Sequence, residues 1–505
     1  MITDSLTGRI HMKTGRKVIA SILGILLIFI GSLCHFSAEW YIQKFGDTGF
    51  DSILFTLFSE KGGLSEEVLM EYVRIGLQPT LIVTGIAIVL FVLLACFTRW
   101  SWYLTGVSLA ACIALCANAA ITTKLPEYLR DYANATQLFE TEYVFPEKTE
   151  IVFPEEKRNL IYILLESMEN TFFSTEEGGA LEQNVIPELY DLALENVNFS
   201  HNDGVGGCDH SSGATWTSGA IVAQTAGIPL KMPWEVRNQY DFEVSMLPGA
   251  NSIVEILKEN GYNYTFMCGS NATYGARAQY FEQHGADNIV DYYTAINEGI
   301  IMDGYFEWWG LADSDLYMYA QFKLEELAAQ DEPFALTLLT VDTHSPGGYI
   351  CSMCTDDFEE QYDNVLACAS FQLYDFLDWL SWQDFYENTT IVIVGDHLSM
   401  DNDYMLHALG DAYDTYERTL YNCFINSAAE PVNEKNRVFT QFDLFPTTLA
   451  AMGAKISGER LALGTNLFSD VPTLAEKMGF EELDQELGRA SELYRNQFMI
   501  PPSDN

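Results

Sequence analysis

The sequence predicts an α/β protein that is anchored in a membrane by helices near its N-terminus. Three long apolar runs fall within the first 125 of its 505 residues, and short apolar runs of strand type then alternate with helical stretches. Such alternation is typical of a mostly parallel sheet covered by helices. We therefore expect a membrane domain at residues 1–125, a linker at 126–157, an α/β domain at 158–470 and a helical tail at 471–505.

Each of the three apolar runs is about long enough to cross a bilayer as a helix, which takes roughly 20 residues. None of them contains Asp, Glu, Lys or Arg, so three buried core helices are a weak alternative. The first run is longer than the usual core of a cleaved signal peptide, which favours an anchor that is retained. The runs are VIASILGILLIFIGSLCHF from Val18, TLIVTGIAIVLFVLLACF from Thr80 and WYLTGVSLAACIALCANAAITT from Trp102.

Basic residues predict the orientation of these helices. Four of them precede the first run, and Lys and Arg are enriched on the cytoplasmic side of membrane helices. The N-terminus is then cytoplasmic, and three crossings place everything after Leu125 outside the cytoplasm. Arg99, between the second and third runs, agrees with a cytoplasmic loop. The four basic residues are Arg9, Lys13, Arg16 and Lys17.

The acidity of the chain lies entirely after Leu125. The formal net charge is −45, with 26 basic and 71 acidic residues, of which 17 basic and 63 acidic ones follow Leu125. A surface of this charge repels nucleic acid and anionic headgroups at long range. We therefore expect no nucleic-acid partner.

Polar residues stand where three apolar runs of strand type end. Glu166 ends NLIYILLES, His344 ends PFALTLLTVDTH, and Asp396 and His397 follow IVIVG. The carboxyl ends of parallel strands meet at one edge of a sheet, so these side chains are candidates for one site. Two carboxylates and an imidazole suit Mn²⁺ or Zn²⁺. The alternative is that Asp396 caps a helix and His397 is an ordinary satisfied polar residue.

A stretch rich in small and hydroxyl residues, GCDHSSGATWTSGAIVAQTAGIPL (207–230), contains a candidate nucleophile. Thr217 precedes a helical run, and a helix N-terminus favours an anion. A divalent cation nearby would lower the pKa of its hydroxyl and activate it. The alternative is that Thr217 is only an N-cap. Rival hydroxyls are Ser211, Ser212, Thr215 and Ser218.

Four of these motifs occur in an order that resembles a known family. NLIYILLES, GATWTSGAIVAQTAGIPL, TVDTHSPGGY and IVIVGDHLSM resemble the sulfatase-like branch of the alkaline phosphatase superfamily. Within it, the chain is most similar to membrane phosphoglycerol transferases, which make lipoteichoic acid or decorate osmoregulated periplasmic glucans. The Trp-Thr pair with its AGIPL is the specific part, whereas Gly-Asp-His is widely shared. The resemblance implies an extracytoplasmic sulfatase-like catalytic domain.

The resemblance also implies roles for individual residues. Glu166, Thr217, Asp396 and His397 would bind one Mn²⁺, or another divalent metal such as Zn²⁺ or Mg²⁺, with Thr217 as the nucleophile. Arg277, in NATYGARAQYF, would hold the substrate phosphate, the alternative being a surface arginine.

Two further segments have expected positions near the site. His344 would lie near the phosphate and stabilise or protonate the leaving oxygen. WWGLADSDLY, around Trp309, would be structural and line the site.

The reaction implied by the resemblance is transfer of phosphoglycerol from phosphatidylglycerol, in the outer leaflet of the cytoplasmic membrane, to a glycan, polymer or glycolipid hydroxyl. A phosphoethanolamine transferase is one alternative. A sulfatase is another, but its Cys/Ser-x-Pro-x-Arg motif is missing around Thr217. The third is an inactive membrane sensor or scaffold, against which the intact set of four candidate ligands argues.

Two features depart from the family pattern. Asp209 and His210 either bind a second metal or merely make their loop polar, and we favour the polar loop. Cys351 and Cys354 form a Cys-x-x-Cys motif, for which we expect a structural disulfide, Cys354 with Cys368, since no second motif completes a zinc site.

Overall fold

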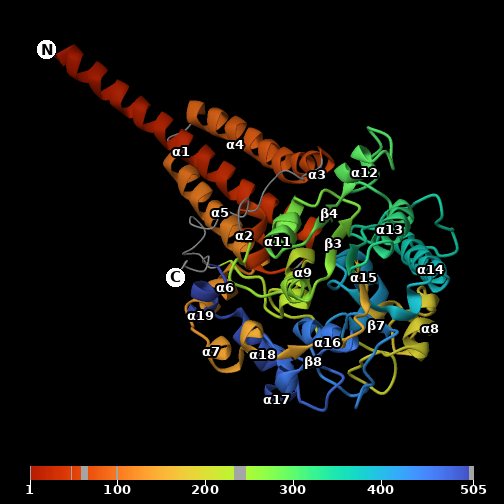
Figure 1. The fold of residues 1–505 in the computed structure, drawn as a ribbon. Coiled ribbons are helices and arrows are strands. Elements are labelled where there is room, and N and C mark those ends of the chain that lie inside the picture. The colour runs from red at the N-terminus through yellow and green to blue at the C-terminus, as the bar shows by residue number, and fades with distance from the viewer. Residues whose placement is uncertain (1, 47, 59–65, 98–100, 233–245, 500–505) are drawn as a thin grey trace. The chain divides into compact units, whose positions relative to one another are not determined.

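The computed structural model describes residues 2–46, 48–58, 66–97, 101–232 and 246–499 (Figure 1). The chain forms two compact units, which are treated separately below. The first consists of Met1–Phe50 and Leu64–Leu129, and the second of Asp51–Gly63 and Arg130–Asn505.

The first unit contains three helices that are long and apolar enough to cross a membrane. The apolar segments are Lys17–Phe45, Leu69–Leu94 and Trp102–Thr122. The Thr105 hydroxyl donates a hydrogen bond to the carbonyl of Ala20 at 2.7 Å, so the first and third helices touch. The three N-terminal apolar helices that the sequence predicts are thus confirmed. The unit's helices are α1 (Ile2–Phe45), α3 (Glu66–Tyr72), α4 (Gln78–Phe97) and α5 (Ser101–Thr122), with a π-helical turn at Val73–Leu77.

The second unit is built on a six-stranded sheet in the order β4-β3-β5-β2-β6-β7. All neighbouring strands are parallel except β7, which runs antiparallel to β6 at the sheet edge. The mostly parallel sheet expected from the sequence is therefore confirmed. The strands are β2 (Asn159–Leu165), β3 (Asn263–Cys268), β4 (Asn288–Val290), β5 (Phe334–Leu339), β6 (Thr389–Gly395) and β7 (Asn422–Ile425).

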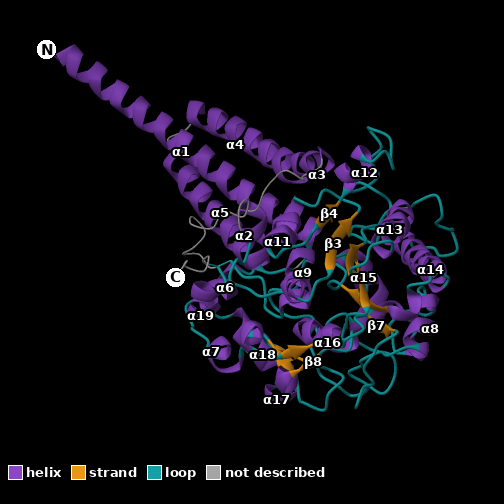
Figure 2. Ribbon diagram, viewed as in Figure 1, coloured by secondary structure: helices purple, strands orange, loops and turns teal. Residues whose placement is uncertain are grey.

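Helices cover both faces of this sheet, which explains why its central strands are apolar throughout (Figure 2). On one face, Ile161 and Ile163 of β2 are buried against α8 (Pro187–Glu195), α13 (Asp313–Ala328) and α14 (Gln361–Ser381). On the other face, the Tyr162 hydroxyl donates to Gln224 of α9 (Thr217–Ala226) at 2.9 Å. Side chains alternate between the two faces along a strand. Those of β2 therefore pack in the apolar core on one face, and on the other face the hydroxyl of Tyr162 has a hydrogen-bond partner.

The remaining helices are short. The N-terminus of α10, for example, is capped by Ser252 together with Glu255, a reciprocal capping box. The helices are α2 (Phe50–Phe58), α6 (Leu125–Tyr132), α7 (Leu138–Glu142), α10 (Ile253–Glu259), α11 (Arg277–Gln283), α12 (Tyr292–Asn297), α15 (Asn402–Leu409), α16 (Leu444–Ala451), α17 (Leu474–Met478), α18 (Phe480–Gly488) and α19 (Glu492–Gln497). Four two-residue strands are β1 (Ile151–Val152), β8 (Lys455–Ile456), β9 (Arg460–Leu461) and β10 (Gly464–Thr465).

The segment expected to be a linker, 126–157, is folded against the second unit from Arg130 onward. Its β1 pairs with β8, and Phe139 is fully buried among the rings of Tyr494 and Phe498. The residues from Arg130 onward in this segment are therefore packed within the second unit. In the tail, 471–505, the described residues are mostly helical, with α17, α18 and α19.

Candidate active site

The strand ends bring two candidate ligands together through sheet register. Leu165 of β2 is paired with Gly395 of β6. The next residues along these parallel strands are Glu166 and Asp396, and their side chains are 3 % and 0 % exposed. The backbone N–H of Asp396 donates to the carbonyl of Leu165 at 3.1 Å, which extends the pairing by one residue. The two carboxylates therefore meet at the carboxyl edge of the sheet.

Thr217 reaches the same place from the first turn of α9. Its Oγ1 lies 3.5 Å from Oε2 of Glu166 and 3.4 Å from Nε2 of His397. A glycine is required in this turn, since a Cβ on Gly219 would lie only 2.7 Å from the carbonyl oxygen of Gly213 in the preceding loop. Among the rival hydroxyls, Ser218 donates to the carbonyl of Gly275 instead.

Hydrogen bonds fix the orientation of His397 and Asp396. Nδ1 of His397 lies 2.9 Å from the carbonyl of Leu398, which makes Nδ1 the donor and leaves Nε2 facing the cluster. Oδ1 of Asp396 accepts from the backbone N–H groups of Ser167 and His397 at 2.8 and 2.7 Å. Its Oδ2 is buried without a hydrogen-bond partner among the described residues, 3.3 Å from Nε2 of His397.

The electrostatics of this cluster favour a bound cation. Burial, and then the charge of Glu166, raise the pKa of Asp396 to about 7. Burial opposes a charge on His397, but the carboxylates of Asp396 and Glu166 outweigh it and raise the pKa of its imidazole. Ligand atoms of all three residues lie within 4.8 Å of one another. Two carboxylates, an imidazole nitrogen that faces them and a buried oxygen without a hydrogen-bond partner therefore fit a divalent cation.

Several residues that support this site were not singled out from the sequence. The amide Nε2 of Gln224 donates to the carbonyl of Gly395 at 3.1 Å, and that of Gln441 donates to the carbonyls of Ala214 and Asp396 at 2.9 and 3.1 Å. A glutamine inside an apolar helical run, as in AIVAQTAG, was the available signal for Gln224.

An ion pair supports the loop that follows His397. Arg418 donates from Nε to Oε2 of Glu169 at 2.8 Å and from Nη2 to the carbonyl of Ser399 at 2.8 Å. Glu169 is fully buried and also accepts from the backbone N–H of Ser399. The two partners are 249 residues apart, so no local pattern could reveal the pair.

Arg277 is buried and not a surface arginine, since only 7 % of the residue is exposed. Its Nε donates to the carbonyl of Tyr274 at 2.9 Å, and Nη2 donates to Oγ of Ser270 and the carbonyl of Asn271 at 3.0 and 2.8 Å. These bonds hold the loop whose Gly275 accepts from Ser218, the neighbour of Thr217. Arg277 is thus placed next to the start of α9.

His344 and Trp309 lie on the loops around the same strand ends. The hydroxyl of Thr343 donates to the backbone carbonyl of Glu166, so the His344 loop abuts the end of β2. The ring of Trp309 lies 5.0 Å from that of His344 and 5.6 Å from that of Tyr274, between centroids. Trp309 therefore connects the His344 loop with the Arg277 loop.

Asp209 and His210 do not join Glu166, Asp396 and His397 in one ligand group. Asp209 lines an acidic cavity of about 570 Å³ with Glu417, and burial, Glu417 and Asp484 raise its pKa to about 7. Burial, followed by the charges of His397 and Arg418, holds the pKa of His210 well below its usual range.

The fold and the cluster together define a class of protein. It is an α/β domain whose parallel strands end in two carboxylates and an imidazole, with a threonine hydroxyl at the N-terminus of a helix beside them. The chain belongs to the sulfatase family, whose model matches residues 158–454.

Curated relatives are phosphoglycerol transferases. Phosphoglycerol transferase I of Escherichia coli is 29% identical over 416 residues, which cover 77% of this chain and 50% of the relative. Phosphoglycerol transferase I of Escherichia fergusonii is 32% identical over 267 residues, which cover 52% of this chain and 33% of the relative. The chain spans a third to a half of these relatives. The resemblance expected from the sequence is confirmed at about 30% identity.

Solved structures with a similar fold include the lipoteichoic acid synthase LtaP of Listeria monocytogenes. It is 18% identical, with a TM-score of 0.48, and the match covers 64% of this chain and 79% of that one. A phosphoglycerol transferase of Streptococcus pyogenes, GacH in complex with sn-glycerol-1-phosphate, is 12% identical with a TM-score of 0.44 and covers 74% and 89%.

Proposed function

We propose that this protein is a membrane-bound phosphoglycerol transferase that works through a covalent intermediate on Thr217. The donor is phosphatidylglycerol, and the acceptor is a hydroxyl of a glycan, polymer or glycolipid. The observation that carries the proposal is the position of Thr217 Oγ1, 3.5 and 3.4 Å from Glu166 and His397 at the start of α9. Similarity to phosphoglycerol transferases supports the choice of donor.

Glu166, Thr217, Asp396 and His397 are the residues that would hold the divalent cation, Mn²⁺ by resemblance, with Zn²⁺ or Mg²⁺ as the alternatives. A bound cation supplies positive charge that lowers the pKa of the threonine hydroxyl and polarises the phosphate. The hydrogen bond from Nδ1 of His397 to the Leu398 carbonyl keeps its Nε2 ready as a ligand.

In the first step, Oγ1 of Thr217, which has already lost its proton to solvent, forms a bond to the phosphorus of the donor. The bond from phosphorus to the diacylglycerol oxygen breaks, and His344 gives that oxygen its proton. Arg277 binds the phosphate oxygens, a task that suits a guanidinium. In the second step, the acceptor hydroxyl loses its proton to His344 and attacks the phosphorus, and the bond to Thr217 breaks.

Three helices able to cross a membrane support a location at the cytoplasmic membrane. The basic residues before the first apolar run, which begins at Val18, favour an extracytoplasmic position for the sulfatase-like unit. An anchor keeps the site near lipid and raises the effective concentration of donor. The acidic surface repels an anionic lipid, but salt screens this repulsion beyond about 10 Å at 0.1 M.

The test uses the full chain purified in detergent, with headgroup-labelled phosphatidylglycerol and Mn²⁺. Wild-type protein is expected to release diacylglycerol and to carry label on Thr217, detected by peptide mass spectrometry. Thr217→Ala should do neither. Ser218→Ala is the matched control, because its hydroxyl is one residue away but bonds to Gly275.

Two results would overturn parts of the proposal. Undiminished transfer by Thr217→Ala would remove the covalent mechanism. Consumption of phosphatidylethanolamine in place of phosphatidylglycerol would keep the nucleophile and replace the donor.

A further inference from the structure

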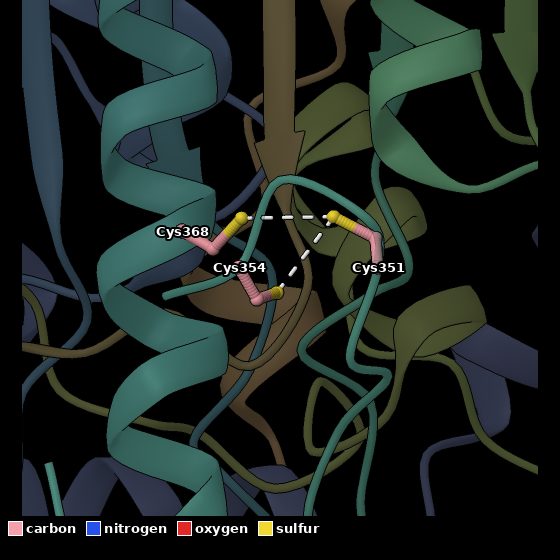
Figure 3. A group of neighbouring side chains, drawn as sticks. All are labelled: Cys351, Cys354 and Cys368. Carbon is pink, nitrogen blue, oxygen red and sulfur yellow. Dashed lines mark hydrogen bonds between the residues drawn. The ribbon is translucent and has the colours of Figure 1, made fainter. Parts of the chain in front are cut away.

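Three cysteines outside the Thr217 cluster have their sulfur atoms together (Figure 3). Sγ of Cys351 lies 3.7 Å from Sγ of Cys368 and 3.7 Å from Sγ of Cys354. All three sulfurs lie within 4.8 Å of one another. Cys351 and Cys354 come from the loop after β5, and Cys368 projects from α14. All three thiols are free, so the disulfide expected between Cys354 and Cys368 is not formed.

These separations match the ligand spacing of a tetrahedral thiolate site. With a Zn–S distance of about 2.3 Å, two sulfurs on one zinc ion are about 3.8 Å apart. Both short sulfur pairs have this separation. The Cys-x-x-Cys spacing of Cys351 and Cys354 is also one that structural zinc sites use.

The backbone of the loop also contacts the sulfur of Cys351. The backbone N–H of Met353 donates to Sγ of Cys351 at 3.4 Å. The same sulfur lies 3.7 Å from each of the other two sulfurs. A thiolate, and not a thiol, is the form that binds metal.

Gln372 offers a fourth ligand one helical turn after Cys368. Its Nε2 lies 3.0 Å from Sγ of Cys368 and 3.6 Å from Sγ of Cys351. Its Oε1 is buried and has no hydrogen-bond partner among the described residues. Turning the amide by half a rotation exchanges the two atoms and points the unpartnered oxygen at the sulfurs.

We propose that Cys351, Cys354 and Cys368 bind a Zn²⁺ ion or another thiophilic divalent cation, with the Gln372 amide oxygen as the fourth ligand. Thiols that remain protonated release their protons as they bind the ion. The ion ties the loop that carries His344 to α14, where Gln361 already donates to the carbonyls of Gly347 and Gly348 at 3.0 and 3.2 Å. It is a structural site, distinct from the cluster at Thr217.

Cobalt substitution tests this site without relying on enzyme activity. The full chain is purified without reductant or chelator, and its metal is replaced by Co²⁺. We expect a thiolate-to-cobalt charge-transfer band, which the oxygen and nitrogen ligands at Thr217 cannot produce. The band should be lost in Cys368→Ser and unchanged in Cys423→Ala, a buried cysteine whose Sγ faces the carbonyl of Leu192 instead.

Metal content and mass complete the test. Wild-type protein should contain one more equivalent of zinc than Cys368→Ser, and its cysteines should react with iodoacetamide faster after chelation. A chain with no charge-transfer band whose intact mass is lower by two hydrogens would overturn the proposal, because a disulfide would then hold two of the sulfurs. If Cys368→Ser does not fold, the band and zinc content of the wild-type protein decide alone.

Discussion

Leu165 and Gly395 are register partners across β2 and β6, and this single pairing sets the distance between Glu166 and Asp396. The backbone leaves little room at this point, because a Cβ on Gly395 would lie 1.9 Å from the carbonyl oxygen of Met168. The close approach of these two backbone segments therefore brings the two carboxylates together beside Thr217.

Replacing Gly395 by Ala should destabilise the second unit. The added methyl group cannot occupy its position unless the chain at Met168 shifts, so we expect a loss of about 3 kcal/mol or more in the free energy of unfolding. Urea denaturation followed by tryptophan fluorescence would measure it. A loss of less than about 0.5 kcal/mol in the free energy of unfolding would show that the backbone segments at Gly395 and Met168 move apart easily.

Replacing Asp396 by Asn should abolish stabilisation by divalent cations. A ligand present at 100 times its dissociation constant stabilises a fold by about 2.7 kcal/mol. We expect Mn²⁺ to raise the melting temperature of the wild-type protein but not that of Asp396→Asn. In Asp411→Asn, which changes an exposed carboxylate, the shift should persist. An equal shift in Asp396→Asn would place the cation elsewhere.

Replacing Arg277 by Lys should loosen the loop beside α9. Lysine cannot reproduce the three hydrogen bonds that the guanidinium makes to Tyr274, Ser270 and Asn271, so stability should fall by about 1–2 kcal/mol. If Arg277 also holds the substrate phosphate, the KM for labelled donor should rise at least tenfold. Arg130→Lys, at an exposed position, should change neither quantity.

The buried carboxyl of Asp209 should make stability depend on pH. Its folded-state pKa of about 7 exceeds the ordinary value of 3.8, because of burial and the nearby Glu417 and Asp484. The folded state then holds a proton that the unfolded state releases, so stability should fall as pH rises from about 4 to about 7 and level off above that. The slope from this group is about 1 kcal/mol per pH unit.

Asp209→Asn should remove this slope while leaving the rest of the pH profile in place. Melting temperatures measured from pH 4.5 to 8 would show it as a smaller decline in the variant. A parallel decline in both proteins would assign the slope to other buried acids, such as Asp443, whose pKa burial raises to about 6.

Much of the fold and of the candidate site could be predicted from local patterns. The apolar runs from Val18, Thr80 and Trp102 indicated helices, and the strands that end at Leu165 and Gly395 were recognisable as buried runs. A parallel sheet gathers strand ends at one edge, so the order of residues along the chain was enough to group Glu166, Asp396 and His397.

Other relations depend on contacts between distant segments. The hydroxyls from Ser211 to Ser218 are chemically alike, and packing against β2 and β6 is what puts Thr217 against Glu166. Likewise, the sequence shows Cys351 and Cys354 as neighbours, but their meeting with Cys368 depends on where α14 lies.

The sequence by itself therefore determined the class of fold, the apolar helices and the strand-end cluster, since hydrophobic periodicity and the end of a buried strand are local properties of the chain. Only the tertiary structure decided which hydroxyl faces the carboxylates and that the segment 126–157 belongs to the second unit from Arg130 onward. It also decided that the sulfur atoms of Cys351, Cys354 and Cys368 lie within 4.8 Å of one another. The physical reason is that such contacts join residues far apart along the chain, and packing of the whole core sets their distances.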